Sequence, residues 1–421
     1  MIREELNAIL LEGIKAADPE HAVVSNVVLD GETLTVNGSI FDLRAYKRIF
    51  VVGAGKASER MAAGIEKVLG PRIDEGIVVT KKKTGITKRI EVMEGSHPLP
   101  DKRSIEATEK IIRLLEGCGC GDLVIVLISG GGSSLLCRPR VSLEAFREVT
   151  EKLMKAGADI RDLNTVRKKL SSVKGGRLAA LADGADVLSL IISDVVGDDL
   201  EFIASGPTVS DSSTNEEARQ ILEKYGIVNK EASECLSGRE SAVESSAKNF
   251  LIATNRLALE AIKAEALKRG YKPFVLSSSF EGEASQIGKF LCSVAKEIYR
   301  HGEPFDRPAL VLCGGEAVVN VRGNGRGGPN MEIAASFALD LGEAEASIAC
   351  MASDGEDGST TAAGSYADNT TCSRACEKGL DVRRFLNNND ALTLFERLDD
   401  LIVTGSTGTN VNSFWLVYVD L

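Results

Sequence analysis

The stretch LVIVLISGGGSS, residues 123–134, joins six apolar residues directly to a cluster of glycines and serines. The run from Leu123 to Ile128 is short and apolar throughout, which is typical of a strand buried on both faces of a parallel sheet. The three glycines let the backbone approach a ligand closely. Ser133 and Ser134 can cap a following helix or donate hydrogen bonds. The stretch predicts a strand, an anion-binding loop and a helix, and a tight turn without a ligand is the simpler alternative.

Apolar runs alternate with amphipathic stretches in the sequence around this loop. Further strands are expected at residues 49–52, 76–80 and 187–192. Helices are expected at residues 56–69, 102–115 and 143–156. This alternation predicts a parallel sheet with helices on both faces. Nearer the start, Asp30-Gly31 between residues 23–29 and 32–36 predicts a β-hairpin.

The alternation is interrupted between Pro207 and Asn249, where the sequence becomes polar and rich in serine. It resumes with expected strands at residues 250–253, 274–276, 309–313, 401–404 and 414–419, and with expected helices at residues 257–268 and 282–300. A chain of 421 residues is too long for one ordinary core. We therefore predict two α/β domains, one over residues 1–240 and one over residues 241–421.

Composition excludes several classes of protein. The net charge of −11 argues against a general nucleic-acid surface, which needs a basic face. No apolar run approaches the roughly 20 residues of a membrane span, and the first residues have no signal-peptide profile. We therefore expect a cytoplasmic protein. The nine cysteines are expected to be free thiols, because they lack both the context of disulfides and the spacing of a zinc site.

Lys56 follows Gly53 and Gly55 at the expected start of a helix. A cation there opposes the helix dipole by roughly 0.3–1 kcal/mol unless an anion lies in front of it. A surface lysine without a ligand is the alternative. The segment is neither a Walker A motif nor a dinucleotide fingerprint, because Phe50 and Ser58 occupy positions where those motifs need glycine.

Charged residues gather after other expected strands. Asp194, Asp198 and Asp199 follow residues 187–192 and suit Mg²⁺ binding or acceptance of a hydroxyl proton; for Asp198 and Asp199, helix caps and solvated turns are the alternative. Residues 167–177 contain five cations, which predicts a basic wall for an anionic ligand. A solvated helix face would explain two of them, Lys168 and Lys169.

Glycine-rich polar loops recur in the second half of the chain, at residues 314–316, 323–330, 353–358 and 404–412. Any one of them could be a plain surface turn. Because so many are divided between two α/β regions, we expect a ligand in a cleft between the domains.

The sequence resembles the type-2 glycerate kinase family, whose C-terminal half is called the MOFRL domain. Nine segments carry the resemblance in the family's order, from about residue 50 to 415: VGAGKAS, GSHPLPD, LISGGGSSLL, LNTVRKKLSSVKGGRLA, SDVVGDDLEFIASGPTV, GGE, GNGRGGPN, SDGEDG and TGSTGTNVN. Any single match would be weak, whereas nine in order are highly specific.

The resemblance implies ATP-dependent phosphorylation of D-glycerate at its 2-hydroxyl, with Mg²⁺, to give 2-phosphoglycerate and ADP. It also implies an N-terminal Rossmann-like domain and a smaller C-terminal MOFRL-type domain, with the active site between them. An older family label, hydroxypyruvate reductase, is disfavoured because no dinucleotide fingerprint is present. A kinase for another hydroxy acid or sugar acid and a non-enzymatic nucleotide-binding sensor are the alternatives. The oligomeric state, including a homo-oligomer, stays open.

The resemblance matches Lys56 to the family's catalytic lysine. The family's second catalytic arginine corresponds to Pro329, so Arg326 is its nearest substitute. We assign Asp194 to the substrate hydroxyl and Asp198 to Mg²⁺, and we expect the glycerate carboxylate on backbone amides or on the Arg167 and Lys174 wall. The candidates for binding substrate or nucleotide are Gly53, Gly55, Ser129, Gly130, Gly131, Gly132, Ser133, Ser134, Arg167, Lys174, Gly315, Glu316, Asn330, Asp354, Thr407 and Asn410.

Overall fold

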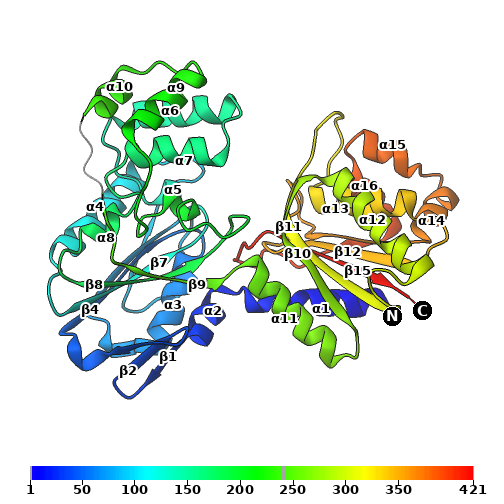
Figure 1. The fold of residues 1–421 in the computed structure, drawn as a ribbon, viewed down its shortest axis with the longest axis horizontal. Helices are drawn as coiled ribbons and strands as arrows, with labels where there is room; N and C mark the ends of the chain where they lie inside the picture. Colours follow the sequence, from blue (N-terminus) through cyan, green and yellow to red (C-terminus); the bar gives the residue numbers. More distant parts are fainter. Residues whose placement is uncertain (1, 239–242, 421) are drawn as a thin grey trace. The chain divides into compact units, whose positions relative to one another are not determined.

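The protein forms two compact units in a computed structural model that describes residues 2–238 and 243–420 (Figure 1). The N-terminal unit is Pro19–Ile252, and the C-terminal unit combines residues 2–18 with residues 253–420. The boundary expected between residues 240 and 241 lies outside the described residues. The division differs from the expected one at the chain start, because residues 2–18 pack with the C-terminal unit.

The N-terminal unit is built on a six-stranded sheet with the order β6-β5-β4-β7-β8-β9. The strands are β4 (Arg48–Ala54), β5 (Glu75–Thr80), β6 (Glu91–Glu94), β7 (Asp122–Ile128), β8 (Asp186–Ile192) and β9 (Lys248–Ala253). Strand β4 pairs in parallel with β5 and β7, and the β5–β6 and β7–β8 pairs are also parallel. Every residue of β7 is buried. The parallel α/β sheet expected from the apolar runs is confirmed.

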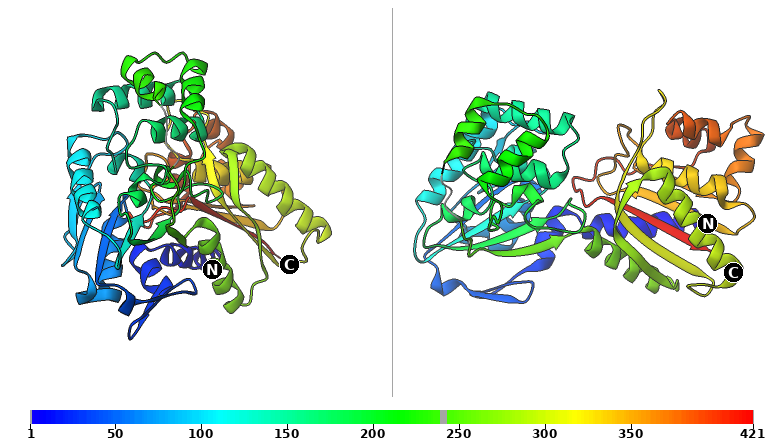
Figure 2. Two further views of the ribbon diagram at one scale, coloured as in Figure 1. Left: turned by 60° about the vertical axis from the view of Figure 1, so that its left-hand side comes forward. Right: turned by 45° about the horizontal axis from the view of Figure 1, so that its top comes forward.

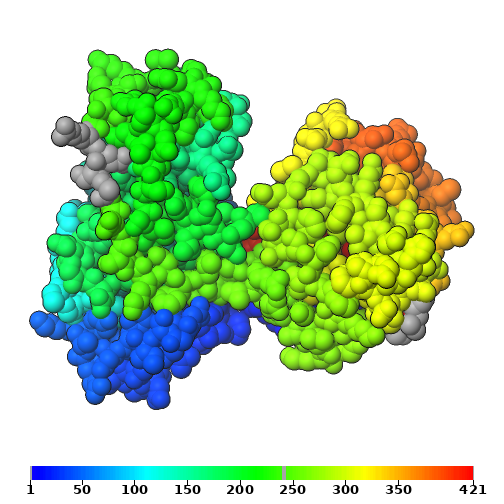
Figure 3. Space-filling view, viewed as in Figure 1, coloured from blue at the N-terminus to red at the C-terminus, as the bar shows by residue number. Residues whose placement is uncertain are grey.

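Helices cover this sheet and extend beyond it. They are α2 (Pro19–Asn26), α3 (Ser58–Leu69), α4 (Lys102–Glu116), α5 (Gly132–Leu135), α6 (Leu143–Lys155), α7 (Ile160–Lys169), α8 (Arg177–Ala180), α9 (Asn215–Lys224) and α10 (Lys230–Ser237). Helices α6, α7, α9 and α10 share a separate apolar cluster and gather at one end of the unit (Figure 2). In the space-filling view, the green residues of α9 and α10 form the outer surface of this end (Figure 3).

A small antiparallel sheet of β1 (Val27–Asp30), β2 (Thr33–Val36) and β3 (Ser39–Asp42) completes the N-terminal unit. The expected hairpin around Asp30-Gly31 is confirmed, although residues 23–26 belong to α2. Short 3-10 turns lie at Leu43–Ala45 (η1), Gly70–Arg72 (η2) and Ile203–Ser205 (η3).

The C-terminal unit contains a second six-stranded sheet with the order β10-β11-β15-β12-β13-β14. The strands are β10 (Pro273–Glu283), β11 (Ala309–Val318), β12 (Ala346–Ala352), β13 (Gly364–Asp368), β14 (Leu401–Ile402) and β15 (Ser413–Val419). Strands β10 and β11 are parallel, while β11–β15, β15–β12, β12–β13 and β13–β14 are antiparallel. This sheet is therefore mixed.

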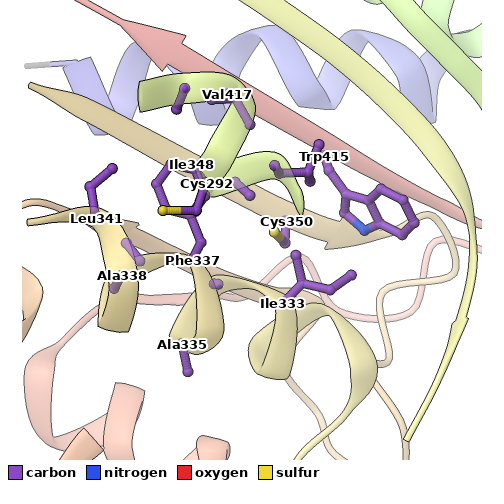
Figure 4. Packing of buried hydrophobic residues seen from close by; sticks show 14 of the residues in the cluster. Cys292, Ile333, Ala335, Phe337, Ala338, Leu341, Ile348, Cys350, Trp415 and Val417 are labelled. Atoms are coloured by element: carbon purple, nitrogen blue, oxygen red, sulfur yellow. The ribbon is translucent and has the colours of Figure 1, made fainter. Parts of the chain in front are cut away.

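Helices pack on both faces of the mixed sheet. They are α1 (Ile2–Ala16), α11 (Asn255–Lys268), α12 (Ala284–His301), α13 (Pro329–Leu341), α14 (Thr371–Glu377), α15 (Val382–Asn387) and α16 (Ala391–Leu398). On one face, Phe337 of α13 packs near Ile348 of β12, and Trp415 of β15 belongs to the same apolar cluster (Figure 4). On the other face, α1 runs beside α11 (Figure 1). Phe414 and Trp415 are adjacent in β15, so their side chains point to these two opposite faces of the sheet.

The fold also bears on the state of the cysteines and on membrane-spanning helices. All nine cysteines are free thiols, as expected. Among the described residues, no helix combines the length and the apolar character that crossing a membrane would require.

Candidate active site

The glycine-rich loops of β4 and β7 lie side by side because the two strands are paired in parallel, with Ala54 opposite Ile128. The N–H of Lys56 donates to the Gly130 carbonyl at 2.9 Å, and the N–H of Ala57 donates to Ser129 Oγ at 3.1 Å. Gly55 has φ +150°, and a Cβ there would lie 2.0 Å from Ser129 Oγ. Only glycine fits this position, so Gly55 allows the two loops to join.

Lys56, Asp194 and His97 all lie against the triple-glycine loop. A Cβ at Gly130 would lie 2.1 Å from Asp194 Oδ2. A Cβ at Gly131 would lie 3.1 Å from His97 Cδ2 and 3.2 Å from Lys56 Cγ. The structure thus brings together the predicted catalytic residues of the N-terminal unit, Lys56 and Asp194. Gly53 and Gly132 instead allow close packing, against Leu127 and Ala204 respectively.

The loop backbone offers free donors beside these side chains. Among the residues that the structure describes, no hydrogen-bond acceptor takes the N–H groups of Gly130, Gly131 and Ser133. Clustered backbone N–H groups of this kind form concave sites for anions. The arrangement fits the anion-binding role that the glycines and serines predicted.

Asp194 and Asp198 supply carboxylates at the end of β8. Burial raises the pKa of Asp194, and the charge of Lys56 opposes this rise. Burial also raises the pKa of Asp198, against a hydrogen bond from Ser193. No group of three or more metal-binding side chains occurs within residues 2–238 and 243–420. Mg²⁺ generally takes one or two carboxylates and completes its ligands with phosphates and water.

The predicted basic wall separates into two structural groups. Lys168 and Lys169 pair with Asp211 at 2.8 and 2.9 Å, so their charges are neutralised inside the unit. Lys174 is fully buried, and its Nζ donates to the carbonyls of Ser133 at 2.7 Å and Leu136 at 2.9 Å. The side chain of Lys174 therefore supports the loop from beneath and does not form a wall that a ligand could touch.

Arg167 is buried beside Lys174 and donates from NH2 to Ser134 Oγ at 3.3 Å. Burial lowers the pKa of Arg167 to about 10. The pKa of Lys174 falls to about 7, first because of burial and then because of the Arg167 charge. These two cations form no ion pair among the described residues, which is unusual for buried charges.

The serines of α5 are fixed by segments to which the sequence reasoning assigned no such role. Ser133 Oγ lies 2.7 Å from Ser205 Oγ, and Ser205 in turn donates to Asn164 Oδ1 at 2.6 Å. Ser205 has φ +62°, a strained conformation for a residue with a side chain. Ser134 donates to the Pro98 carbonyl. Strain next to a loop of this kind is common at functional sites.

His97 lies against the loop, although sequence reasoning gave it no task in phosphoryl transfer and considered it only as the one histidine on which a catalytic triad could rest. Burial, followed by the charges of Lys56, Lys81 and Arg167, lowers the pKa of His97 to about 4. The imidazole is therefore neutral near pH 7. The segment GSHPLPD was the available signal, because it contributed to the family resemblance without a role being assigned to its histidine.

In the C-terminal unit, Asn330 has a structural role. Its N–H and Nδ2 donate to Asp357 Oδ1, each at 3.0 Å, and its Oδ1 accepts from Trp415 Nε1 at 2.8 Å. Only 1% of Asn330 is exposed. Its hydrogen-bonding groups face the core, so the structure places this predicted ligand-binding residue inside the unit.

Other predicted residues of the C-terminal unit do meet at one end of the central strands β11, β15 and β12. Gly315 pairs with Ser413 where β11 and β15 adjoin, and Asn412 Nδ2 donates to Glu316 Oε2 at 3.3 Å. Thr407 donates from its N–H to the Asp354 carbonyl at 3.2 Å. The loop expected at residues 314–316 is instead part of β11, and these contacts join the end of β11 and the loop after β12 to the segment before β15. In the last loop, Asn410 Oδ1 accepts the N–H of Asn412 at 2.9 Å.

Arg326 is exposed on the segment that leads into α13. Its N–H donates to Asp390 Oδ1 at 3.2 Å, and its carbonyl accepts from Leu392 at 3.0 Å. The backbone of the segment is thus fixed while the guanidinium faces solvent. Pro329 is the first residue of α13, a position that proline favours.

Comparisons with known proteins add to this geometry. Residues 5–237 match the family model "Domain of unknown function (DUF4147)", and residues 309–413 match the MOFRL family. A glycerate 2-kinase of Pyrococcus horikoshii is 41% identical over 99% of this chain and 97% of its own. A D-glycerate 2-kinase of Thermotoga maritima is 41% identical over 87% of this chain and 89% of its own. The crystal structure of a glycerate kinase from Thermotoga maritima matches with a TM-score of 0.91 and 36% identity, covering 99% of both chains.

Proposed function

This chain belongs to the glycerate 2-kinase family with DUF4147 and MOFRL domains, and we propose that it transfers a phosphoryl group from ATP to D-glycerate. The 2-hydroxyl is the proposed acceptor, and 2-phosphoglycerate and ADP are the products. The placement of Lys56 and Asp194 against one glycine loop is the observation that carries this proposal. Phosphoryl transfer requires positioning and charge neutralisation, which these groups can supply.

Each group of the N-terminal unit has a proposed task. The Asp194 carboxylate orients the glycerate 2-hydroxyl and accepts its proton as the oxygen attacks phosphorus. Lys56 donates to the phosphoryl oxygens and stabilises their negative charge. The free N–H groups of Gly130, Gly131 and Ser133 hold an anionic group of a ligand. Mg²⁺ would be held by Asp198, directly or through water, and would neutralise charge on the phosphates.

The C-terminal unit supplies the remaining proposed contacts. Glu316, Asp354, Thr407 and Asn410 are proposed to bind nucleotide or substrate, because the end of β11 and the loops of the other three residues meet at one end of the central strands. Arg326 is proposed as the second cation, since Pro329 occupies the position of the family's arginine. The single cleft expected between the domains stays a prediction.

Three broader expectations also stay predictions. The net charge of −11 supports a small-molecule substrate over nucleic acid. The cytoplasmic location rests on the sequence alone. Formation of a homo-oligomer is left open.

A coupled assay with purified protein, ATP, Mg²⁺ and D-glycerate tests the proposed reaction. The coupling enzyme consumes 2-phosphoglycerate and is used without a mutase, so that transfer to the 2-position gives an immediate signal. A signal only after a mutase is added would contradict the 2-position. ADP release with another hydroxy acid or sugar acid, but not with D-glycerate, would favour the alternative kinase. ATP binding with no ADP release would favour a sensor.

A further inference from the structure

Two buried basic side chains lie beneath the loop that carries the free N–H groups. Lys174 is fully buried, and Arg167 is 9% exposed. The Nε of Arg167 is buried and has no hydrogen-bond partner among the described residues. Burial of an unpaired charge is costly in a folded protein. A counter-charge from outside the chain would offset this cost.

The contacts of Lys174 fix the loop itself. Its Nζ donates hydrogen bonds to the carbonyls of Ser133, within α5, and of Leu136, directly after α5. Arg167 holds the hydroxyl of Ser134 from the same side. These bonds leave the N–H groups of Gly130, Gly131 and Ser133 available as donors.

We propose that Lys174 is a positioning residue that orients the glycine loop and becomes the ammonium counter-charge when an anionic group binds there. The anion is a carboxylate or a phosphoryl group, and binding is accompanied by uptake of one proton from solvent. The assignment of that anion to glycerate or to the nucleotide rests on the proposed function. Lys174 does not touch the ligand, because the α5 backbone lies between them.

The surroundings of Lys174 support a change of protonation. Its pKa of about 7 in the free protein follows from burial and from Arg167, while the Cys137 thiol acts weakly in the opposite direction. His97 is neutral at this pH, because its own pKa is about 4. Lys56 and Asp194 lie at the loop beside Gly131 and Gly130. An anion at the loop favours the charged form of Lys174 and raises its pKa.

Titration calorimetry of the full-length protein tests this proposal. D-glycerate and sulfate are each titrated at pH 7.5 in two buffers of different ionisation enthalpy. Sulfate stands in for a phosphoryl group and carries no proton at this pH. We expect wild-type protein to take up roughly 0.7 proton per bound anion at pH 7.5 and roughly 0.1 at pH 6.

The Lys174→Gln variant retains an N–H donor but no titrating group. We expect it to bind the anion about 10-fold or more weakly and without proton uptake, with circular dichroism confirming the fold. The Lys174→Met variant removes the donor as well and should bind more weakly still. Lys155→Gln, on the exposed surface of α6, is the matched control and should retain affinity and uptake.

Each outcome of the titrations either identifies the bound anion or overturns the proposal. Uptake with D-glycerate places a carboxylate on the loop, and uptake with sulfate alone places a phosphoryl group there. Binding without uptake in wild-type protein, uptake that persists in Lys174→Gln, or no binding of either anion would overturn the proposal. If the protein binds sulfate with proton uptake but cannot phosphorylate glycerate, the proposal for Lys174 is supported and the proposed function is wrong.

Discussion

Lys56 combines an exposed side chain with a backbone fixed by the neighbouring loop. The Lys56→Met variant should keep its fold, because no packing is lost, and should lose the charge that stabilises the transferring phosphoryl group. We expect kcat to fall by about 10³-fold or more. The coupled assay measures this change, and thermal unfolding checks the fold. Turnover near the wild-type rate in a folded variant would contradict the catalytic role of Lys56.

A substitution at Gly131 tests the geometry of the loop, and the same substitution at another glycine controls for backbone strain. It has φ +82°, and a Cβ there would press on His97 and Lys56. We expect Gly131→Ala to lose about 1–2 kcal/mol of stability and also at least 10-fold in kcat/KM. Gly38 is the matched control, because it has the same φ and a Cβ added there would meet no atom of the described residues within 4 Å. Gly38→Ala should lose similar stability and keep full activity, and equal activity losses in both variants would reject the interpretation.

At the scale of single elements, Asp357 stabilises the start of α13. Its carboxylate accepts the N–H groups of Asn330 and Met331, at 3.0 and 2.8 Å. Burial nevertheless raises its pKa from 3.8 to about 6, and the hydrogen bonds only reduce the rise. A group with a raised folded-state pKa contributes most below its unfolded pKa. The contribution of Asp357 is therefore complete below about pH 3.8 and is lost as the pH rises through 6.

The Asp357→Asn variant tests this pH dependence. Relative to the variant, wild-type protein should lose about 2.4 kcal/mol of unfolding free energy between pH 4 and pH 7. Urea titrations followed by Trp415, the single tryptophan, report on the C-terminal unit. Asp381→Asn, at the exposed start of α15, is the control for the loss of a carboxylate that caps a helix. A pH-independent difference between wild-type protein and Asp357→Asn would contradict the prediction.

How far the elements could be predicted depended on how strongly each one is buried. Strand β7 was predictable because burial on both faces requires an unbroken apolar run. Helices α9 and α10 were missed because each buries few apolar residues, such as Ala218 and Leu222 of α9. Their ends are set by side-chain caps, including the Thr214 and Glu217 capping box.

The candidate site was predictable where glycine or charge follows a strand directly. Lys56 and Asp194 were found in this way, and the structure places both at the loop. The burial of Lys174 and Asn330 could not be read from their segments, because distant residues such as Leu136 and Trp415 supply their partners. Only the tertiary fold distinguishes a cation that touches a ligand from one that supports a loop.

At the scale of the whole molecule, the two ends of the chain share one unit. Leu6, Ile9 and Leu10 of α1 are fully buried. A Cβ at Gly13 would lie 2.6 Å from Ile262 Cδ1 and 3.3 Å from the Phe414 ring. The first helix is therefore a part of the C-terminal core, far from that core in sequence.

A substitution in α1 should thus destabilise a unit whose other residues begin at position 253. We expect Leu10→Ala to lower the unfolding free energy reported by Trp415 by about 2–5 kcal/mol, because a buried leucine side chain leaves a cavity. Leu11→Ala, at a neighbouring position that is 40% exposed, should change it by less than about 1 kcal/mol. Urea titrations of both variants supply the measurement. An unchanged Trp415 transition in Leu10→Ala would contradict the placement of α1 in the C-terminal unit. It would favour the division of the chain at residue 240 that the sequence predicted.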